Sequence, residues 1–323
     1  MKLMITGGCG FIGSNFIRYV LEKYTEYQII NLDKLTYAGD VNNLKKVADN
    51  ENYNFIQGDI CNRFLVNKIV DSSIDCIINF AAESHVDRSI ENPGIFIDTN
   101  VRGTETLLRA ARKNKINKYI QISTDEVYGS LGQEGNFNEE SSLAPNNPYA
   151  ASKASADLLV RSYHKTYGLS CNIIRCTNNF GPYQYPEKLI PVLIINSLKN
   201  KKLPLYGDGK NVRDWIHVID HCRAIDCVLN KGENGEIYNV GACNERTNLE
   251  VAEMILDILN KPKNLIEFVP DRPGHDRRYA LDTGKIKNEL GWKPIYDFAE
   301  GLSKTVAWYR EHQTWWAEKI SNY

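Results

Sequence analysis

The sequence lacks long apolar runs. No stretch of its 323 residues approaches the ~18 consecutive apolar residues of a membrane-spanning helix. The opening MKLMITGGCG leads directly into a glycine-rich turn and contains no long apolar segment of the kind found in secretory signals. We therefore expect no membrane association and no secretory leader.

The sequence also lacks an excess of charge of either sign. Lys and Arg number 39 and Asp and Glu number 40, so the formal net charge is −1. Proteins that bind nucleic acid or anionic membranes usually carry a strong basic field. We predict no nucleic-acid partner, and we expect an anionic small ligand to be held by local cations.

The eight cysteines lack the spacing of metal or redox sites. There is no CxxC pair and no Cys/His cluster, and several cysteines lie inside apolar runs such as DCIINF and CNIIRC. This pattern favours buried, reduced thiols, and therefore the cytoplasm, over disulfides or zinc. We expect no metal site.

What the sequence does contain is an alternation of apolar runs and amphipathic stretches. Strands that are apolar throughout and separated by helices indicate a parallel sheet covered on both faces. We predict an α/β fold, a doubly wound parallel sheet of the Rossmann type, which binds ligands outside the carboxyl ends of its strands. The predicted strands span 2–6, 28–32, 54–58, 75–80, 118–123 and 170–175, and the predicted helices span 11–23, 64–71, 99–113 and 149–167.

After about residue 178 this alternation breaks into short pieces separated by prolines. The αβ pattern returns over about 212–243, so we expect a smaller, interleaved C-terminal substrate-binding domain. Residues 1–177 with about 212–243 would form the dinucleotide-binding domain, and 178–211 with 244–323 the second domain. An amphipathic helix is predicted at 248–260.

The first candidate site is the glycine pattern in TGGCGFIGS. Gly7, Gly10 and Gly13 lie between a predicted strand and a predicted helix, where glycines let the backbone approach a pyrophosphate at the helix N-terminus. Asp33 follows the second strand and is placed to accept hydrogen bonds from ribose hydroxyls, which favours NAD over NADP. Asp59, at the third strand end, would contact the adenine amino group or simply cap its strand.

The second candidate site is Tyr149 and Lys153 in YAASK, four residues apart on a predicted helix and hence on one face. A nearby ammonium stabilises tyrosinate, so we expect the pKa of Tyr149 to be lowered toward the working range. Tyr149 would then accept a proton from a substrate hydroxyl.

The third candidate site is STDEVYG, residues 123–129, where Asp125 and Glu126 follow a buried strand. The pair is either a solvated acidic turn or a general acid beside a general base. Two close carboxyls favour one protonated and one ionised group, because a like charge raises one pKa.

Together these motifs resemble the extended short-chain dehydrogenase/reductase family and, more narrowly, the dTDP-glucose 4,6-dehydratases. Sugar-nucleotide epimerases of that superfamily lack the Asp-Glu pair, and GDP-mannose dehydratases carry only the glutamate, so the TDE triplet is the most specific feature. The stretches that carry the resemblance are AAESHVDRSI, STDEVYGS, NPYAASK, RCTNNFGPYQYPEKLIP, LPLYGDGKNVRDWIHV and DRPGHDRRYALD.

The resemblance implies a reaction in three parts. Tyr149 deprotonates the C4 hydroxyl of a hexose while hydride passes to NAD⁺, with Thr124 hydrogen-bonded to the same oxygen. Glu126 removes the C5 proton, which the C4 ketone has made acidic, and Asp125 protonates the departing C6 hydroxyl. Hydride then returns to C6 and C5 is reprotonated, which gives a 4-keto-6-deoxy sugar nucleotide and regenerates NAD⁺.

The resemblance also implies two sets of binding residues. For His85 and Asn248 a structural role, in the second case as a helix cap, is an equal alternative. The NAD set is Gly7, Gly10, Phe11, Ile12, Gly13, Asp33, Lys34, Leu35, Thr36, Asp59, Ile60, Phe80, Ala81, Ala82, Ser84, Thr99, Tyr149, Lys153 and Asn179. The substrate set is Ser84, His85, Thr124, Asn178, Asn179, Lys188, Leu189, Pro204, Tyr206, Arg213, Asn248, Arg272, His275 and Tyr279.

Three alternatives stay open at this point. The substrate could be UDP-glucose, since thymine and uracil differ by one methyl group. The reaction could be that of a nucleotide-sugar epimerase or decarboxylase of the same fold, and a non-enzymatic NAD-binding protein is the remaining reading. The resemblance implies a homodimer through the helices near 92–113 and 149–167, which would equally serve a tetramer.

Overall fold

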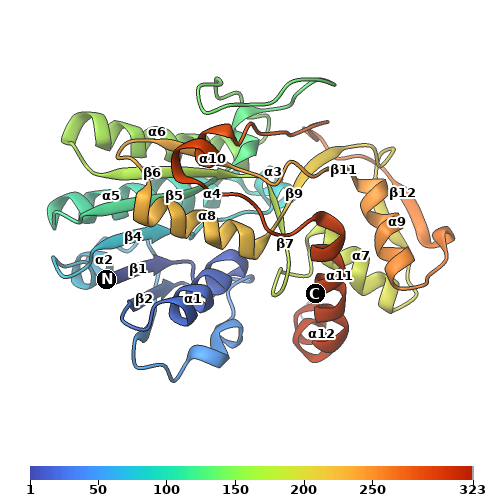
Figure 1. Ribbon diagram of the computed structural model, residues 1–323, viewed down its shortest axis with the longest axis horizontal. Helices are drawn as coiled ribbons and strands as arrows, with labels where there is room; N and C mark the ends of the chain where they lie inside the picture. Colours follow the sequence, from blue (N-terminus) through green and yellow to red (C-terminus); the bar gives the residue numbers. More distant parts are fainter. Residues whose placement is uncertain (322–323) are drawn as a thin grey trace.

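The computed structural model describes residues 1–321, and its main feature is a parallel sheet (Figure 1). Within those residues the sheet has seven strands in the order β10-β6-β5-β4-β1-β2-β3. This order reverses between β1 and β4, which confirms the predicted doubly wound α/β fold. The strands are β1 Lys2–Thr6, β2 Gln28–Asp33, β3 Tyr53–Gln57, β4 Cys76–Asn79, β5 Lys118–Thr124, β6 Cys171–Cys176 and β10 Ile237–Val240.

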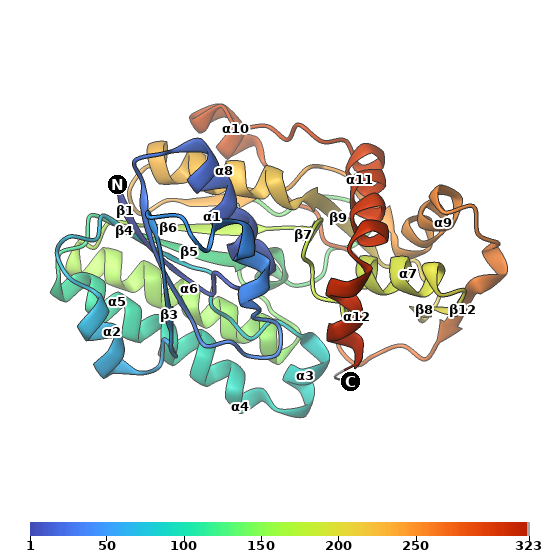
Figure 2. The same ribbon diagram turned by 90° about the horizontal axis from the view of Figure 1, so that it is seen from below.

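Helices cover both faces of the main sheet (Figure 2). The helices α1 (Phe11–Lys23), α8 (Val218–Lys231) and α10 (Gly284–Leu290) lie on one face, and α2 (Arg63–Ile69), α5 (Thr104–Lys113) and α6 (Pro148–Tyr167) on the other. Successive side chains of a strand point to opposite faces. In β1, Leu3 and Ile5 accordingly join the hydrophobic cluster of the first face, whereas Met4 joins that of the second.

The predicted helix at 99–113 is divided in the structure. Residues Ile97–Gly103 form a π-helical turn, η2, before α5 begins at Thr104. The side chain of the buried Asn100 explains the irregular turn, because it bonds the backbone N–H of Glu83 at 2.9 Å and the hydroxyl of Ser152 at 2.8 Å. The turn thus aims a polar side chain inward, between the end of β4 and α6.

The second part of the molecule, on the right in Figure 1, has small sheets and its own core. One small sheet has the order β11-β9-β7 and the other the order β12-β8. Its strands are β7 Asn178–Phe180, β8 Leu203–Tyr206, β9 Val212–His217, β11 Glu245–Thr247 and β12 Ile266–Val269, and its helices are α7 Leu189–Leu198, α9 Asn248–Ile258, α11 Phe298–Glu311 and α12 Gln313–Ser321.

Two segments do not follow the predicted division of the chain. We expected 212–243 to return to the main sheet as a whole, but β9 pairs with β7 and β11, and α8 and β10 make the return. We expected 244–323 to lie entirely in the second domain, but Ile286 and Leu290 of α10 belong to the core under the main sheet. Both segments bury apolar side chains, and the sequence alone does not show which sheet or core those side chains pack against. The overall boundaries stay a prediction, and residues 322 and 323 lie outside the described part.

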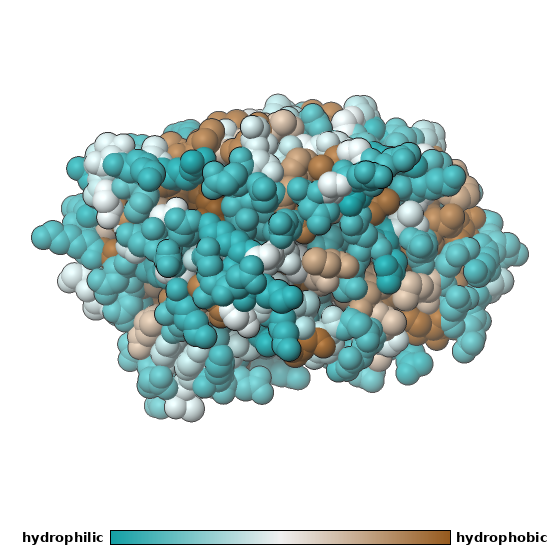
Figure 3. Space-filling view, turned by 45° about the horizontal axis from the view of Figure 1, so that its top comes forward, coloured by the Kyte–Doolittle hydropathy of each residue, from teal (hydrophilic) through white to brown (hydrophobic). Residues whose placement is uncertain are grey.

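The remaining elements are short. They are η1 Val41–Val47, α3 Val86–Glu91, α4 Pro93–Phe96, η3 Asp125–Tyr128 and η4 Lys263–Leu265. The face shown in Figure 3 is largely hydrophilic, with apolar residues in small groups. Within residues 1–321, no helix combines the length and apolarity that crossing a bilayer would require.

Candidate active site

The backbone of the glycine turn after β1 can come close to a ligand, because its glycines carry no side chains. Side chains would not fit at Gly7 and Gly13. Gly7 has a φ of +68°, and a Cβ on it would lie 2.6 Å from the backbone nitrogen of Ala81. A Cβ on Gly13 would lie 2.5 Å from the carbonyl oxygen of Gly7. The turn therefore packs against the end of β4 and presents the N-terminus of α1, an arrangement suited to a pyrophosphate.

Asp33 ends β2 beside this turn. Its Oδ2 accepts a hydrogen bond from the N–H of Cys9 and its Oδ1 one from the N–H of Leu35, both at 2.8 Å. Burial raises the pKa of Asp33, and the two backbone hydrogen bonds oppose that rise. Each oxygen keeps a lone pair for a ribose hydroxyl. Leu35 itself packs against the core and does not line the cavity described below.

Asp59 is both a cap and one member of an ion pair. Its Oδ1 accepts a hydrogen bond from the N–H of Cys61 at 2.8 Å, and its Oδ2 lies 2.8 Å from Nζ of Lys34. Burial opposes ionisation of Asp59, but the hydrogen bonds from Lys34 and Cys61 bring its pKa below the ordinary value. Oδ1 of Asp59 therefore caps the strand end, which is one of the two predicted roles. The other role, a contact with the adenine amino group, stays a prediction.

Thr124 holds the two adjacent acids at the end of β5. Its Oγ1 accepts a hydrogen bond from the N–H of Glu126 at 3.2 Å and donates one to Oδ1 of Asp125 at 3.1 Å. Asp125 is 2% exposed, and its Oδ2 has no hydrogen-bond partner among the described residues. A buried, unpartnered carboxyl oxygen excludes the solvated-turn reading, because water does not reach it.

The two acids differ in their electrostatic surroundings. Burial, followed by the charge of Glu126, raises the pKa of Asp125 well above its ordinary value. Burial also raises the pKa of Glu126, but the cations of Arg213, Arg272 and Lys188 oppose that rise. Burial and the charge of Glu126 thus favour the protonated form of Asp125, whereas the cations favour the ionised form of Glu126.

Asn147, which the sequence analysis did not single out, connects Glu126 to the helix of Tyr149. Its Oδ1 accepts the N–H of Ala150 at 2.8 Å as the N-cap of α6, and its Nδ2 donates to Oε2 of Glu126 at 3.3 Å. An Asn before Pro148 indicates a helix cap from sequence. Only the fold shows the second contact.

Lys153 lies on α6 one turn after Tyr149, as predicted, and its ammonium donates to the carbonyl of Ile122 at 2.6 Å. The expected lowering of the pKa of Tyr149 is wrong for this structure. Burial raises that pKa well above the ordinary value, and the charge of Glu126 adds to the rise. Burial lowers the pKa of Lys153, which the charge of Asp157 opposes.

A buried ion pair fixes α6 relative to the acids. Nε of Arg175, in β6, donates to Oδ2 of Asp157 at 2.9 Å, one helical turn beyond Lys153. Nη1 of the same guanidinium donates to the hydroxyl of Tyr128 at 2.9 Å, and Tyr128 ends η3. The helix of Tyr149 and the turn of Asp125 are thus held by one arginine.

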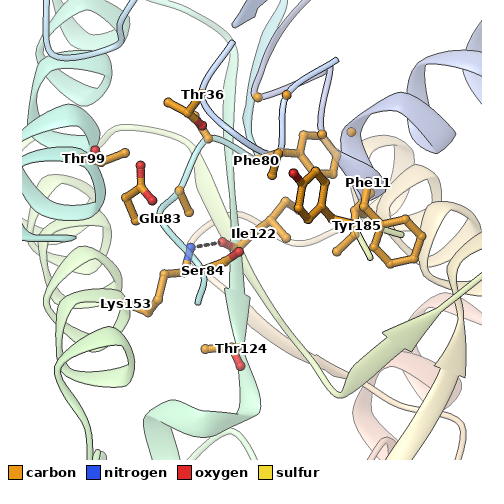
Figure 4. A pocket seen from close by; sticks show the side chains of 18 of the residues that line it. Phe11, Thr36, Phe80, Glu83, Ser84, Thr99, Ile122, Thr124, Lys153 and Tyr185 are labelled. Carbon is orange, nitrogen blue, oxygen red and sulfur yellow. Dashed lines mark hydrogen bonds between the residues drawn. The ribbon is translucent and has the colours of Figure 1, made fainter. Parts of the chain in front are cut away.

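A cavity of about 310 Å³, within the range of small-molecule pockets, joins the glycine turn to the acids. Figure 4 shows Phe11, Phe80 and Tyr185 gathered on one side of it and Lys153 on another, with its ammonium bonded to Ile122. The predicted site residues that line it are Gly7, Gly10, Phe11, Ile12, Gly13, Asp33, Lys34, Thr36, Asp59, Ile60, Phe80, Ala81, Ala82, Ser84, Thr99, Thr124, Asp125, Glu126, Tyr149, Lys153, Asn178, Asn179 and Lys188.

Other predicted substrate residues form a group next to this cavity. Arg213 lies 4.4 Å from the centre of the Tyr279 ring and donates to the carbonyl of Asp276 at 2.9 Å. Arg272 forms an ion pair of 3.1 Å with Asp87. The predicted residues outside the cavity lining are Leu35, His85, Leu189, Pro204, Tyr206, Arg213, Asn248, Arg272, His275 and Tyr279.

For His85 and Asn248 the structure shows which of the two side chains caps a helix, and the contact of either with substrate stays a prediction. His85 is the N-cap of α3, accepting the N–H of Arg88 on Nδ1 at 3.4 Å, so its structural role is clear. Asn248 is not a cap, because Thr247 caps α9 in a capping box with Glu250. Asn248 is buried, and its Oδ1 has no partner among the described residues, which leaves it free for a ligand.

Further polar residues line the cavity that the sequence analysis did not single out, among them Glu83, Gln184, Tyr185 and Glu187. Three of these lie in the stretch YQYPEKL, which is one of the stretches that carry the resemblance. Their position next to the predicted substrate residue Lys188 was the sequence signal that could have identified them. Across residues 1–321, no group of three or more His, Cys, Asp or Glu side chains is arranged to hold a metal ion.

The fold and this cavity define a class: a Rossmann-type protein with a glycine turn, a Tyr-Lys pair and an additional acid pair in one site. The family model for GDP-mannose 4,6 dehydratase matches residues 4–305, and the chain belongs to this family. Within it, the chain is similar to the dTDP-glucose 4,6-dehydratase of Streptomyces niveus, with 51% identity over 98% of this chain and 95% of that protein.

Solved structures show the same likeness. The dTDP-glucose 4,6-dehydratase DesIV from Streptomyces venezuelae, solved with NAD bound, is 50% identical and superposes with a TM-score of 0.96 over 99% of this chain and 100% of that one. The dTDP-glucose 4,6-dehydratase from Bacillus anthracis in complex with NAD is 53% identical, with a TM-score of 0.93 over 99% of both chains.

Proposed function

We propose that this protein is an NAD-dependent hydro-lyase that converts dTDP-glucose to dTDP-4-keto-6-deoxyglucose and water, for the synthesis of deoxysugars such as dTDP-rhamnose. The observation that carries the proposal is that Asp125 and Glu126 line the same cavity as Tyr149, with Asp125 buried and three cations acting on Glu126. A redox site alone would not need a second acid. The relatives named above support the same activity.

The chain's residues fit NAD at the glycine turn. The backbone of Gly7 and Gly13 leaves no room for side chains, and Asp33 offers carboxylate lone pairs to a ribose while repelling a 2′-phosphate. When bound, NAD⁺ accepts a hydride at its nicotinamide ring and brings a positive charge into the site.

Tyr149 is the base for the C4 hydroxyl. Burial favours the protonated phenol in the ligand-free site, and only tyrosinate can accept the C4 proton, so the base requires a nearby positive charge that stabilises tyrosinate. Thr124, whose hydroxyl already orders Asp125 and Glu126, is the second hydrogen-bonding group for the C4 oxygen.

Glu126 and Asp125 perform the elimination of water. Glu126 is ionised beside three cations and removes the proton at C5 once C4 is a ketone, because the carbanion is then an enolate. Asp125 carries its proton in a buried site and delivers it to the leaving C6 hydroxyl. Two adjacent carboxyls thus act in opposite protonation states.

The nucleotide diphosphate is bound by the second part of the molecule. Lys188, Arg213 and Arg272 supply the positive charge that the overall composition does not, and arginines suit bidentate phosphate contacts. The unpartnered Oδ1 of Asn248 and the ring of Tyr279 over Arg213 add polar and apolar contacts.

The test is incubation of the purified protein with dTDP-glucose and, in parallel, with UDP-glucose. We expect an alkali-induced 4-keto absorbance with dTDP-glucose and a lower kcat/KM with UDP-glucose, by about 5–150-fold for the thymine methyl group. Absence of a 4-keto product from both nucleotides would contradict the proposal. A preference for UDP-glucose would correct the base but keep the reaction.

We also propose a cytoplasmic homodimer. All eight cysteines are free, which is typical of a reducing compartment. Ile95, Ile97 and Leu158, on α4, η2 and α6, are exposed and form apolar surface on the helices expected to pair. Light scattering should give twice the chain mass, and Leu158→Lys should shift the protein toward monomer; four times the mass would indicate a tetramer.

A further inference from the structure

Three segments of the chain meet at Glu187. Its Oε1 accepts a hydrogen bond from the hydroxyl of Tyr37 at 2.8 Å, and its Oε2 lies 3.5 Å from Nη2 of Arg88. The guanidinium of Arg88 in turn lies 3.6 Å from the centre of the Tyr37 ring. Each of the three side chains therefore contacts the other two, and we call this group the Tyr37–Arg88–Glu187 triangle.

The triangle joins two parts of the chain that line the cavity. Tyr37 lies between Thr36 and Ala38, which line the cavity next to Asp33. Tyr185 and Glu187 line it from the second part of the molecule, and the rings of Tyr37 and Tyr185 meet edge to face at 5.4 Å. Figure 4 shows the Tyr185 ring beside Phe11 and Phe80, which belong to the dinucleotide-binding part.

Arg88 supplies the positive charge in this contact. His85 also lies 3.7 Å from Oε2 of Glu187, but burial and the charge of Lys188 lower its pKa, so it is neutral at pH 7. Burial and the charge of Glu187 raise the pKa of Tyr37, so its hydroxyl stays a donor. The side chain of Glu187 is 11% exposed, and an ion pair at this burial is screened only in part.

The segment that carries Glu187 is held separately at its base. The hydroxyl of Tyr309 donates to the carbonyl of Gln184, and Nε2 of Gln184 donates to the carbonyl of Asn179 at 2.8 Å. Loss of the triangle should therefore release the end of the segment without unfolding it. This makes conservative substitutions at Tyr37 and Glu187 interpretable.

We propose that the Tyr37–Arg88–Glu187 triangle is a latch that keeps NAD in its site throughout the catalytic cycle, with Tyr37 and Glu187 as positioning residues. The inference rests on the proposed function, in which the hydride taken from C4 must return to C6 of the same sugar. A cofactor that exchanged in mid-cycle would leave the intermediate stranded. Thr36 and Ala38, on either side of Tyr37, line the cavity together with Asp33, so the latch lies beside the ribose end of the site.

The test is the rate at which the full-length protein, loaded with isotopically labelled NAD, loses the label into an excess of unlabelled NAD. We expect Tyr37→Phe and Glu187→Gln each to release NAD about tenfold faster, since each weakens a contact with a charged group. The double variant should be little faster than the faster single variant, because both substitutions open the same contact. Release at the wild-type rate from both single variants would overturn the proposal.

Asp87→Asn is the matched control. It removes the ion pair with Arg272 from the neighbouring position of α3 but leaves the triangle intact. We expect its NAD release to stay within about twofold of wild type; an acceleration equal to that of Glu187→Gln would assign the effect to a loosened α3 and overturn the latch. The release rate needs no turnover, so a failure to form 4-keto sugar would contradict the function separately.

Discussion

At the cofactor end of the cavity, around Gly7, Asp33 and Asp59, the carboxylates are paired within the protein. Asp33 accepts a backbone hydrogen bond on each oxygen, and Asp59 is paired with Lys34. At the acid end, around Asp125 and Tyr149, buried polar atoms lack partners among the described residues, including Oδ2 of Asp125.

This difference indicates how each end works. The cofactor end is complete before a ligand arrives, because local backbone groups position its carboxylates. At the acid end burial raises the pKa values of Asp125 and Tyr149, so both groups favour their protonated forms. Shifted pKa values are typical of groups that exchange protons with a substrate.

The largest expected effect comes from removing the base at the acid end. Tyr149→Phe should lower turnover of dTDP-glucose by about 10²–10⁴-fold, the usual contribution of a positioned acid–base group. NAD affinity should change little, because the cofactor end is organised independently. The measurements are 4-keto formation and NAD binding by calorimetry. Tyr163→Phe, on the same helix, is the control, and equal losses in both variants would contradict the role of Tyr149.

The second prediction separates the two acids. Glu126→Gln should abolish exchange of the C5 hydrogen with solvent deuterium, whereas Asp125→Asn should retain exchange but slow formation of the 6-deoxy product, each by about 10²–10⁴-fold. Mass spectrometry of the sugar nucleotide in D₂O distinguishes the outcomes. The reverse pattern would exchange the two assignments.

The third prediction concerns the cofactor end alone. Asp33→Asn replaces one of the two acceptor oxygens by an NH₂ group, so either the N–H of Cys9 or that of Leu35 loses its acceptor. The substitution also removes the negative charge that repels a 2′-phosphate. NAD should bind about 10–100-fold more weakly, as expected for lost hydrogen bonds to a charged group. Discrimination against NADP should also fall. Unchanged NAD and NADP affinities would contradict the assignment.

The smallest expected effect lies on the pH profile. Protonation of Glu126 as pH falls through its raised pKa removes the base, and ionisation of Asp125 as pH rises through its higher pKa removes the acid, so kcat/KM should be bell-shaped. Asn147→Ala deletes a hydrogen bond to ionised Glu126 and should move the acidic limb upward by a few tenths of a pH unit to about one unit.

The control for Asn147 is another asparagine cap. Asn62→Ala removes the N-cap of α2, where the side chain accepts the N–H of Leu65. Both variants should lose about 1 kcal/mol of stability, the usual cost of a lost cap. Only Asn147→Ala should shift the pH profile; a shift in both would indicate a general effect of helix destabilisation.

The cofactor end could be predicted from sequence because its determinants are local. The turn at Gly7–Gly13 lies within one strand–turn–helix unit, and β1 and α1 begin and end at the predicted residues. The apolar pattern of the six predicted strands was sufficient for the sheet, because five of them bury most of their residues, whereas the edge strand β3 is only partly buried.

The predictions that failed involve contacts between distant segments. The residues of strand 212–217 are compatible with either sheet, and only the folded chain shows that this strand pairs with β7 and β11. The helix α10 covers the main sheet because its residue Ile286 packs into the core of that sheet. The pKa of Tyr149 follows from burial and from Glu126, which sequence spacing cannot supply. The sequence indicates Asn147 as a helix cap and Glu187 as a neighbour of Lys188, but only the fold shows their contacts with Glu126 and Tyr37.

The sequence by itself determined the fold class, the dinucleotide turn and the presence of an acid pair next to a Tyr-Lys helix, since periodicity and spacing are local properties of the chain. The tertiary structure alone decided which acid holds its proton. That choice depends on the burial of Asp125 and on cations that the folded chain brings from the second part of the molecule, of which Arg213 acts on both acids and Lys188 and Arg272 act on Glu126. Electrostatic energy depends on distance in space, and the sequence records only distance along the chain.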